Sequence, residues 1–317
     1  MIPNAFEGVS VESKDLPKTT LKAAYFTAQK LRDHTTFHDV ITFKDASGDS
    51  WNANDDSGTH KGLSYDNFNS AGKDTKHNLL IGTISNTSIK NLNLKFTYTA
   101  VPEVLSSVIT GVNYKIALGD GYTLTPGFRY IEQFDCGGGD IGGASLSGNL
   151  GRDKTPATLL GYSERFSLDT SAWMARLVLS KGAFKLLAGY SDVADEADLV
   201  APWRGFPTSG YTRAMAQLNW VANTQSTMLQ VNYDFGKANI LEGFRVLARY
   251  VVQDFDETKQ FAGALADNKV IHIDFMQRFT ARFNAKIRFG NVNASNRLDG
   301  TNQDSYSEYR FEMNYLF

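Results

Sequence analysis

The amino-acid sequence predicts an all-β protein, an antiparallel β-barrel that spans a membrane. The first observation is alternation: segments of about 9–11 residues, the length of a tilted membrane-spanning strand, place apolar side chains at every second position. The second is that short connections alternate with long polar ones along the chain. The third is a mean hydropathy of −0.30. With no run of about 20 apolar residues, this average excludes a helical membrane protein but not a barrel, whose alternating faces cancel.

Alternation begins near the N-terminus and recurs to the last residue. The first strand is expected near residues 6–14, and the second places Leu21, Ala23 and Tyr25 at alternate positions. Further alternating segments lie at residues 92–98, 122–130, 173–180, 229–235, 244–253, 271–279, 283–290 and 309–317. Because two residues is the strand period, each segment has one apolar and one polar face. We predict about thirteen spanning strands in all.

The connections between these segments alternate in length. Short ones lie at residues 15–18, 118–121 and 180–183. Long polar ones, predicted to be extracellular, lie at residues 28–76, 133–169, 191–227, 254–268 and 292–305, and the shortest outer connection is at 100–107. Short periplasmic turns and long outer loops are typical of membrane barrels. Residues 211–222 are assigned to a loop folded at or into the mouth, because an extra strand there would move the 254–268 loop to the periplasmic side.

The strand count and the N-terminus together predict an incomplete barrel. Thirteen is odd, whereas bacterial membrane barrels normally close with an even number of strands. The opening MIPNAFEGVS has neither the basic nor the apolar region of a signal peptide. We therefore expect residues 1–317 to form one transmembrane barrel domain that lacks its N-terminal part.

A soluble β-sandwich binding protein is the alternative from another fold class. Its strands would also alternate, but its aromatic residues would fall on the inner face without favouring strand ends. Here aromatic residues often lie near strand ends, where rings anchor at membrane interfaces. Examples are Tyr25, Tyr98, Tyr122, Tyr130 and Tyr315. The pattern favours the membrane barrel.

Three stretches resemble one known family, the OprD-type substrate-specific outer-membrane porins (Opr family porins). They are the opening PNAFEGVSVESKDLPKTTLKAAYFT, the internal LEGFRVLARYVVQD and the closing FNAKIRFGNVNASNRLDGTNQDSYSEYRFEMNYLF. The resemblance implies a monomeric barrel of eighteen strands in the bacterial outer membrane, of which about thirteen are present here. It also implies diffusion of small water-soluble, often carboxylate-bearing solutes along a ladder of basic side chains. The terminal Phe317 resembles the family's signal to the barrel-assembly machinery.

The polar faces of the later strands are rich in cations, which we predict to line the lumen as successive weak anion sites. The resemblance places Asn284, Lys286 and Arg310 at ladder positions, although the family usually has Arg where Asn284 stands. The predicted ladder is Arg245, Arg249, Arg278, Lys286, Arg288 and Arg310, with Lys95, Arg129, Arg176, His272 and Asn284 as secondary lining residues. The alternative is that each cation pairs with a wall acid, such as Glu312, Asp274 or Asp234, and only stabilises a wet interior.

Other kinds of site are poorly matched. Residues 45–56 (DASGDSWNANDD) have Ser50 where a calcium loop needs Gly, and Asp56 where it needs Glu. His34 and His38 are spaced as zinc ligands on a helix, but Thr35 stands where the metalloprotease motif has its glutamate. The Gly-rich stretch 136–151 lacks the Gly-Lys-Ser/Thr of a phosphate loop. We expect no metal, no cofactor and no catalytic site.

The expected partners follow from this interpretation. They are small-molecule solutes, outer-membrane lipid and the barrel-assembly machinery. Nucleic acid is not expected, because the net charge is −2. Two further alternatives are a general, unselective porin and a membrane-barrel enzyme such as a lipid hydrolase. The enzyme would need a Ser/His pair at the lipid-facing rim, and the sequence offers no clear one.

Overall fold

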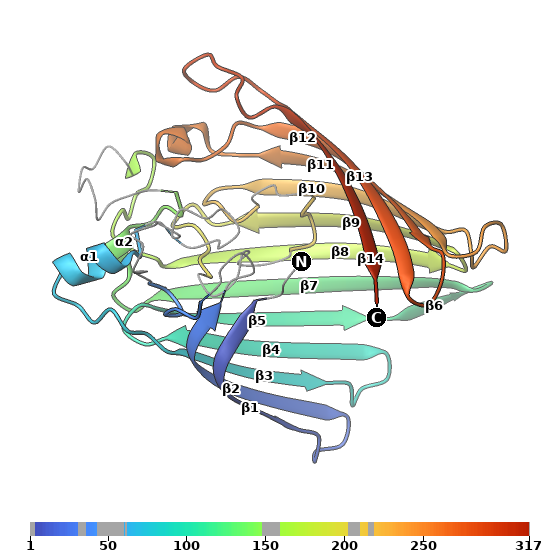
Figure 1. Ribbon diagram of the computed structural model, residues 1–317, viewed down its shortest axis with the longest axis horizontal. Coiled ribbons are helices and arrows are strands. Elements are labelled where there is room, and N and C mark those ends of the chain that lie inside the picture. Colours follow the sequence, from blue (N-terminus) through green and yellow to red (C-terminus); the bar gives the residue numbers. More distant parts are fainter. Residues whose placement is uncertain are drawn as a thin grey trace.

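The computed structural model describes residues 4–30, 36–42, 60, 62–147, 159–201, 210–214 and 219–316. They form one fourteen-stranded sheet with every pairing antiparallel (Figure 1). The first strands are β1 (Ala5–Ser13), β2 (Thr19–Lys30), β3 (Leu79–Asn86), β4 (Leu92–Val101), β5 (Leu105–Tyr114), β6 (Ile116–Gly119) and β7 (Tyr122–Asp135). The later strands are β8 (Thr170–Lys181), β9 (Phe184–Val193), β10 (Gln225–Asp234), β11 (Phe244–Asp254), β12 (Asn268–Arg278), β13 (Phe283–Ala294) and β14 (Tyr306–Tyr315).

The strand order confirms the predicted all-β antiparallel barrel wall. Each strand pairs with its neighbours in sequence from β1 to β14, except that β6 pairs only with β7. β6 continues the line of β5 after a break at Lys115, so thirteen long strands make up the wall. The described parts of 211–222 lie outside the strands, as predicted. Within the described residues, no helix is long and apolar enough to cross a membrane.

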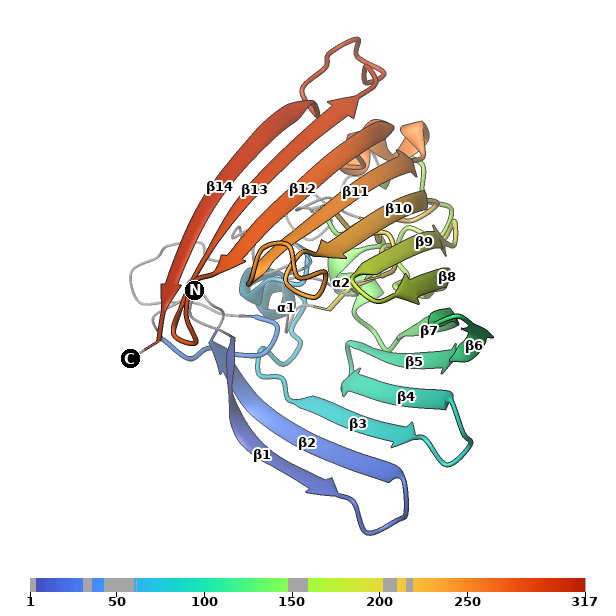
Figure 2. The same ribbon diagram turned by 90° about the vertical axis from the view of Figure 1, so that its right-hand side faces the viewer.

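The outer face of the curved wall (Figure 2) has many exposed apolar side chains. Register places residues of five strands in rows, such as Val231, Ala248, Ile273, Phe289 and Tyr309. Exposure is high at the two edge strands, with Tyr309 of β14 at 76% and Val9 of β1 at 69%. A soluble sandwich would bury these side chains in a dry core. Their exposure in continuous rows is the arrangement expected of a surface that meets hydrocarbon.

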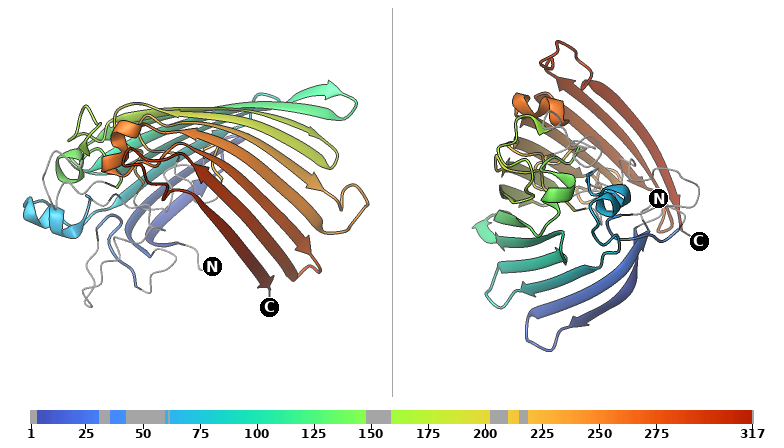
Figure 3. Two further views of the ribbon diagram at one scale, coloured as in Figure 1. Left: turned by 90° about the horizontal axis from the view of Figure 1, so that it is seen from above. Right: turned by 90° about the vertical axis from the view of Figure 1, so that its left-hand side faces the viewer.

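The inner face is divided into two zones. Toward the long loops it is apolar and buried: Leu79, Leu105 and Met174 are fully covered. The loops supply the covering residues, among them Trp220 and Tyr211. Toward the short turns the same face is polar. The loops, with α1 (Tyr65–Ser70) and α2 (Gly139–Gly142), gather at one end of the strands and on the concave side (Figure 3).

The two ends of the strand order, β1 and β14, each have a single partner strand among the described residues. Figure 2 shows them as the two separate edges of the curved wall. Successive antiparallel pairing along thirteen strands makes β1 and β14 run in the same direction.

Candidate functional site: the basic inner wall

The predicted ladder residues lie on one face of β11–β14, in successive rows. Arg249 lies in the row that contains Gln230 and His272, nearest the long loops. Arg288 and Arg310 are directly paired in the next row. The following rows contain Arg245 with Lys286, and then Arg278 opposite Asn284. The strand period and the register therefore bring cations from separate strands into a descending series on the concave side.

A polar network crosses the upper part of this series. The Arg249 Nε donates to the Gln230 Oε1 at 2.6 Å, and an Arg249 Nη1 lies 3.5 Å from the His272 Nδ1. The other ring nitrogen of His272 donates to the Asp274 carboxylate at 3.0 Å. The network thus runs from Gln230 through Arg249 and His272 to Asp274.

Asp274 is the shared acceptor of two ladder residues. Its carboxylate is 2.9 Å from the Arg288 Nε and 3.4 Å from the Lys286 Nζ, and its side chain is only 8% exposed. Together with Arg249, these groups carry three positive charges for one carboxylate. Arg288 and Lys286 therefore do pair with a wall acid, and the network keeps a net positive charge.

The remaining ladder residues differ in their partners. Arg245 lies 2.9 Å from Asp234 in a pair whose arginine is 58% exposed. Arg310 pairs with Glu308 of its own strand, and not with Glu312. Arg278 is exposed and has no ion pair among the described residues. Surface pairs of this kind hold their charges weakly, typically by about 0–1 kcal/mol.

Two pockets on this face place the cations around open space. One, of about 260 Å³, is lined by Arg245, Arg278 and Lys286 together with Asn284 and Asn314. The other, of about 460 Å³, shares Arg245 with it and adds Lys185 and Lys237. Guanidinium, ammonium and amide groups are all donors to carboxylate oxygens.

The secondary lining residues are divided between the ladder and the loops. His272 belongs to the Asp274 network, Asn284 accepts from the Asn314 side chain at 3.1 Å, and Lys95 is exposed. Arg129 and Arg176 instead face the ring of Tyr211, at 5.0 and 4.4 Å from its centroid. These two cations are therefore engaged with a loop that lies against the wall, which their sequence positions did not predict.

The loop segment 210–214 lies directly on the inner wall. A Cβ at Gly189 would overlap the carbonyl oxygen of Tyr211, so only glycine lets this backbone approach β9 so closely. Ser191 and Thr212 also share a hydroxyl hydrogen bond of 2.6 Å. Ala214 packs with Met228, Val251, Val270 and Val292 in the row above Arg249. The predicted inward loop thus covers the wall just above the cations.

Gly189→Ala should displace this segment from the wall. The added methyl group meets backbone, which cannot rotate away, and overpacking costs about 1–3 kcal/mol. We expect a larger single-channel conductance and faster proteolysis at residues 210–214. Gly82→Ala is the control, because a Cβ at Gly82 meets nothing within 4 Å. Equal conductance in both variants would contradict the contact.

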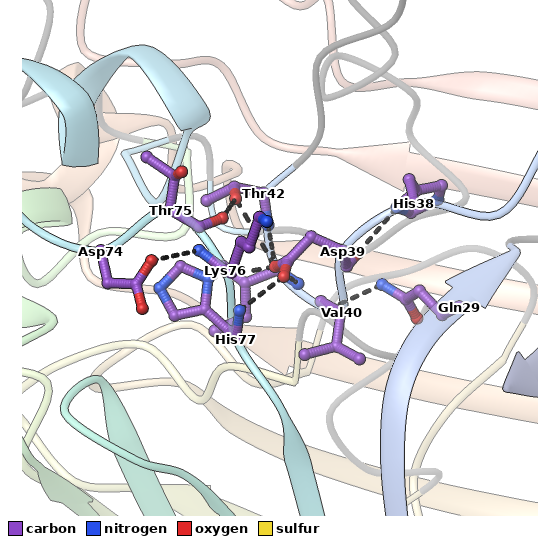
Figure 4. A network of polar contacts seen from close by, with 10 residues as sticks. Gln29, His38, Asp39, Val40, Thr42, Asp74, Thr75, Lys76 and His77 are labelled. Carbon is purple, nitrogen blue, oxygen red and sulfur yellow. Dashed lines mark hydrogen bonds and ion pairs between the residues drawn. The ribbon is translucent and has the colours of Figure 1, made fainter. Parts of the chain in front are cut away.

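The first long loop is fixed by a carboxylate at its start (Figure 4). β2 pairs with β3 as far as Phe26. Beyond Phe26, β2 pairs with the loop itself, through an isolated bridge between Gln29 and His38. Asp39 accepts from the Ile41 and Thr42 backbone at 2.9 and 3.0 Å, and from the His77 backbone and ring at 2.6 and 3.0 Å. One carboxylate therefore holds both ends of the loop at the wall. An aspartate that accepts a hydrogen bond from the backbone two residues later favours a turn, so Asp39 could have been predicted from the sequence to start one.

A second carboxylate, Asp198, joins three loop segments. It accepts from the Leu146 N–H at 2.6 Å, the Ala222 N–H at 2.8 Å and the Tyr162 hydroxyl at 2.7 Å. Burial raises the pKa of Asp198 to about 6 against the lowering effect of these donors. Beside it, Lys259 lies between Asp195 and Asp256 at 2.5 and 2.6 Å. Burial opposes the charge of Lys259, but the two carboxylates outweigh it and raise its pKa.

The weaker sequence candidates have structural roles or lie outside the described residues. His34, residues 45–56 and Phe317 lie outside them. The His38 Nδ1 is 2.7 Å from the backbone oxygen of Asp39. The glycines after Cys136 allow close backbone packing: a Cβ at Gly138 would meet the Val104 oxygen at 2.7 Å. The described residues contain no group of three or more potential metal ligands.

Comparison with known proteins gives the same architecture. OccK8 (OprE) of Pseudomonas aeruginosa has a TM-score of 0.70 at 15% identity, covering 99% of this chain and 71% of that chain. OccAB3 of Acinetobacter baumannii has a TM-score of 0.70 at 15% identity, with 99% and 68% covered. OpdK of Pseudomonas aeruginosa, solved with vanillate, has a TM-score of 0.69 at 15% identity, with 99% and 68% covered.

At the sequence level, none of the curated proteins compared with the chain matches it. The model of the outer membrane porin family OprD, in contrast, matches residues 1–317 without interruption. The fold of the wall agrees with this match. The chain therefore belongs to the OprD family of outer-membrane porins.

Proposed function

We propose that this porin passes small carboxylate-bearing solutes along the basic inner wall. As an OprD-family protein it is a channel for small solutes in the bacterial outer membrane. The observation that carries the finer proposal is the register: Arg249, Arg288, Arg310, Arg245, Lys286 and Arg278 occupy successive rows on one face. A solute carboxylate can pass from the cations of one row to those of the next and stay beside a positive surface throughout.

The ion pairs tune this path and do not abolish it. In a pair such as Arg245 with Asp234, the carboxylate screens the cation without removing it, and the exposed guanidinium stays open to competition from an entering carboxylate. Weak, repeated sites suit a channel, because each must bind strongly enough to admit the solute and weakly enough to release it. Vanillate, with which the similar porin OpdK was solved, carries a carboxylate and is consistent with this class of permeant.

The proposal includes a closed wall. Unpaired strand edges in hydrocarbon leave backbone groups unsatisfied, at several kcal/mol each. Direct closure of β1 on β14 would need a parallel pair, because both run in the same direction. An odd number of further strands between them would keep every pairing antiparallel. We propose that the porin in the membrane is a cylinder completed in this way.

Neutralising two ladder residues tests the path. The variant Arg288→Gln with Arg310→Gln, purified from outer membranes, should lose most of its anion preference in bilayer reversal-potential measurements. The control Lys14→Gln with Lys18→Gln removes the same charge from an exposed turn and should keep the preference. An unchanged preference in the first variant would contradict the ladder, and no preference in the parent protein would favour a general porin. Steady unitary currents are expected only if the wall is closed.

A further inference from the structure

The outer face of the wall has an apolar hollow over β3, β4, β5 and β7, with a volume of about 330 Å³. Two register rows explain its shape. In one, Thr110 lies between Phe96 and Tyr130, and in the next Val112 lies between Leu94 and Phe128. A small side chain between two large ones leaves a depression in each row. Phe96 and Phe128 are 41% and 43% exposed, so the hollow opens onto the hydrocarbon-facing surface.

Three exposed lysines lie on the neighbouring short turns below this hollow. They are Lys18 after β1, Lys90 before β4, and Lys115 after β5. The turns are tied together, because the Thr87 N–H donates to the Lys18 oxygen and the Lys115 N–H donates to the Asn91 oxygen, each at 2.9 Å. Lys90 is four residues before Leu94 at the lining of the hollow, which is about 13 Å along a strand. Three neighbouring turns that each carry an exposed lysine therefore lie beside or below the strands that form the apolar hollow.

We propose that this is a binding site for one phospholipid with an anionic headgroup. The phosphodiester would lie among the three lysines and an acyl chain would fill the hollow. The site needs only that the chain is an outer-membrane protein, and does not depend on the solute that passes through it. Charge alone would not single out this place, because Lys14, Lys181, Lys237 and Arg282 are also exposed at short turns. The hollow above Lys18, Lys90 and Lys115 is what makes a site there.

Lipid retention measures the site directly. The porin, purified from outer membranes in detergent, would be incubated with dioleoylphosphatidylglycerol or dioleoylphosphatidylcholine and analysed by native mass spectrometry. We expect one phosphatidylglycerol to be retained in preference to phosphatidylcholine. The variant Lys18→Gln, Lys90→Gln, Lys115→Gln should weaken its retention by at least about tenfold, since each lysine near a membrane surface attracts anionic lipid. The control Lys181→Gln, Lys237→Gln, Arg282→Gln makes the same charge change at the short turns between β8 and β13. It should leave the retention of phosphatidylglycerol unchanged.

The hollow is tested separately from the charges. Thr110→Phe fills it and leaves every lysine in place, so retention of both lipids should fall; Val112→Phe is an independent filling variant. Heat-modifiable migration on gels identifies the folded variants. Equal losses in the two lysine variants would overturn the site in favour of a diffuse charge effect. Unchanged lipid retention in the two filling variants would also overturn the site. The same holds if glycerol phosphate, which has no acyl chain, competes with phosphatidylglycerol as well as an intact lipid does.

Discussion

Asp274→Asn should raise the anion preference of the channel about two- to fivefold. Among the described residues, Asp274 is the acid that pairs with Lys286 and Arg288, and His272 links it to Arg249. A unit charge about 8 Å from a permeating ion contributes about 0.5–1 kcal/mol at an effective dielectric constant of about 40–80, which gives this factor. Reversal potentials in a salt gradient measure it. A shift toward cations would show that Asp274 acts by holding the arginines in place and not by its charge.

The same substitution should also destabilise the wall. Asparagine keeps one acceptor oxygen but loses the charge, and a hydrogen bond to a charged group contributes about 1.5–3 kcal/mol. Urea unfolding in detergent should therefore show a loss of that size. Asp234→Asn is the matched control, because its partner Arg245 is 58% exposed and such pairs contribute about 0–1 kcal/mol. Equal losses in the two variants would mean that burial of Asp274 adds nothing to the strength of its contacts.

The wall was predictable from sequence because its outer face obeys a local rule. Much of β13 and β14, over residues 283–289 and 309–315, alternates strictly and is predicted directly. β3, β5 and β9 alternate less clearly, and each contains a glycine: Gly82, Gly111 and Gly189. Gly189 makes room for Tyr211, a contact with a loop residue 22 positions away that a local pattern cannot contain. The alternation of short and long connections nevertheless indicates where β3, β5 and β9 lie, so the predicted number of strands is correct.

The inner face was predictable only in part. Its polar rows, with Arg288 and Lys286, follow from the same alternation. Toward the mouth the inner positions are apolar, as at Met174 and Leu105, since loops fold over them and exclude water. Which loop covers which strand depends on the tertiary fold. The tertiary fold alone therefore determines that Arg129 and Arg176 stack on Tyr211. The same is true of the loop contacts that Asp39 and Asp198 make through their carboxylates.

The loop cluster around Asp198 should loosen as the pH rises. Burial raises the pKa of this carboxyl from 3.8 to about 6. A carboxyl that binds its proton more tightly in the folded state makes the free energy of unfolding fall as the pH rises between the two values, and leaves it constant above. The whole change is about 3 kcal/mol, of which about half lies between pH 5 and 7.5. Tyr162 and Lys259 both have raised pKa values, so neither titrates in this range.

Hydrogen exchange can read this change at the donors themselves. The amides of Leu146 and Ala222, which donate to Asp198, should be about tenfold less protected at pH 7.5 than at pH 5, after correction for intrinsic rates. Asp198→Asn cannot ionise, so its protection should not change across this interval. Asp135→Asn, which alters a carboxylate that caps the Gly137 and Gly139 amides, should keep the parent's pH dependence. The same tenfold change in Asp198→Asn would assign the titration to another group and remove Asp198 as its cause.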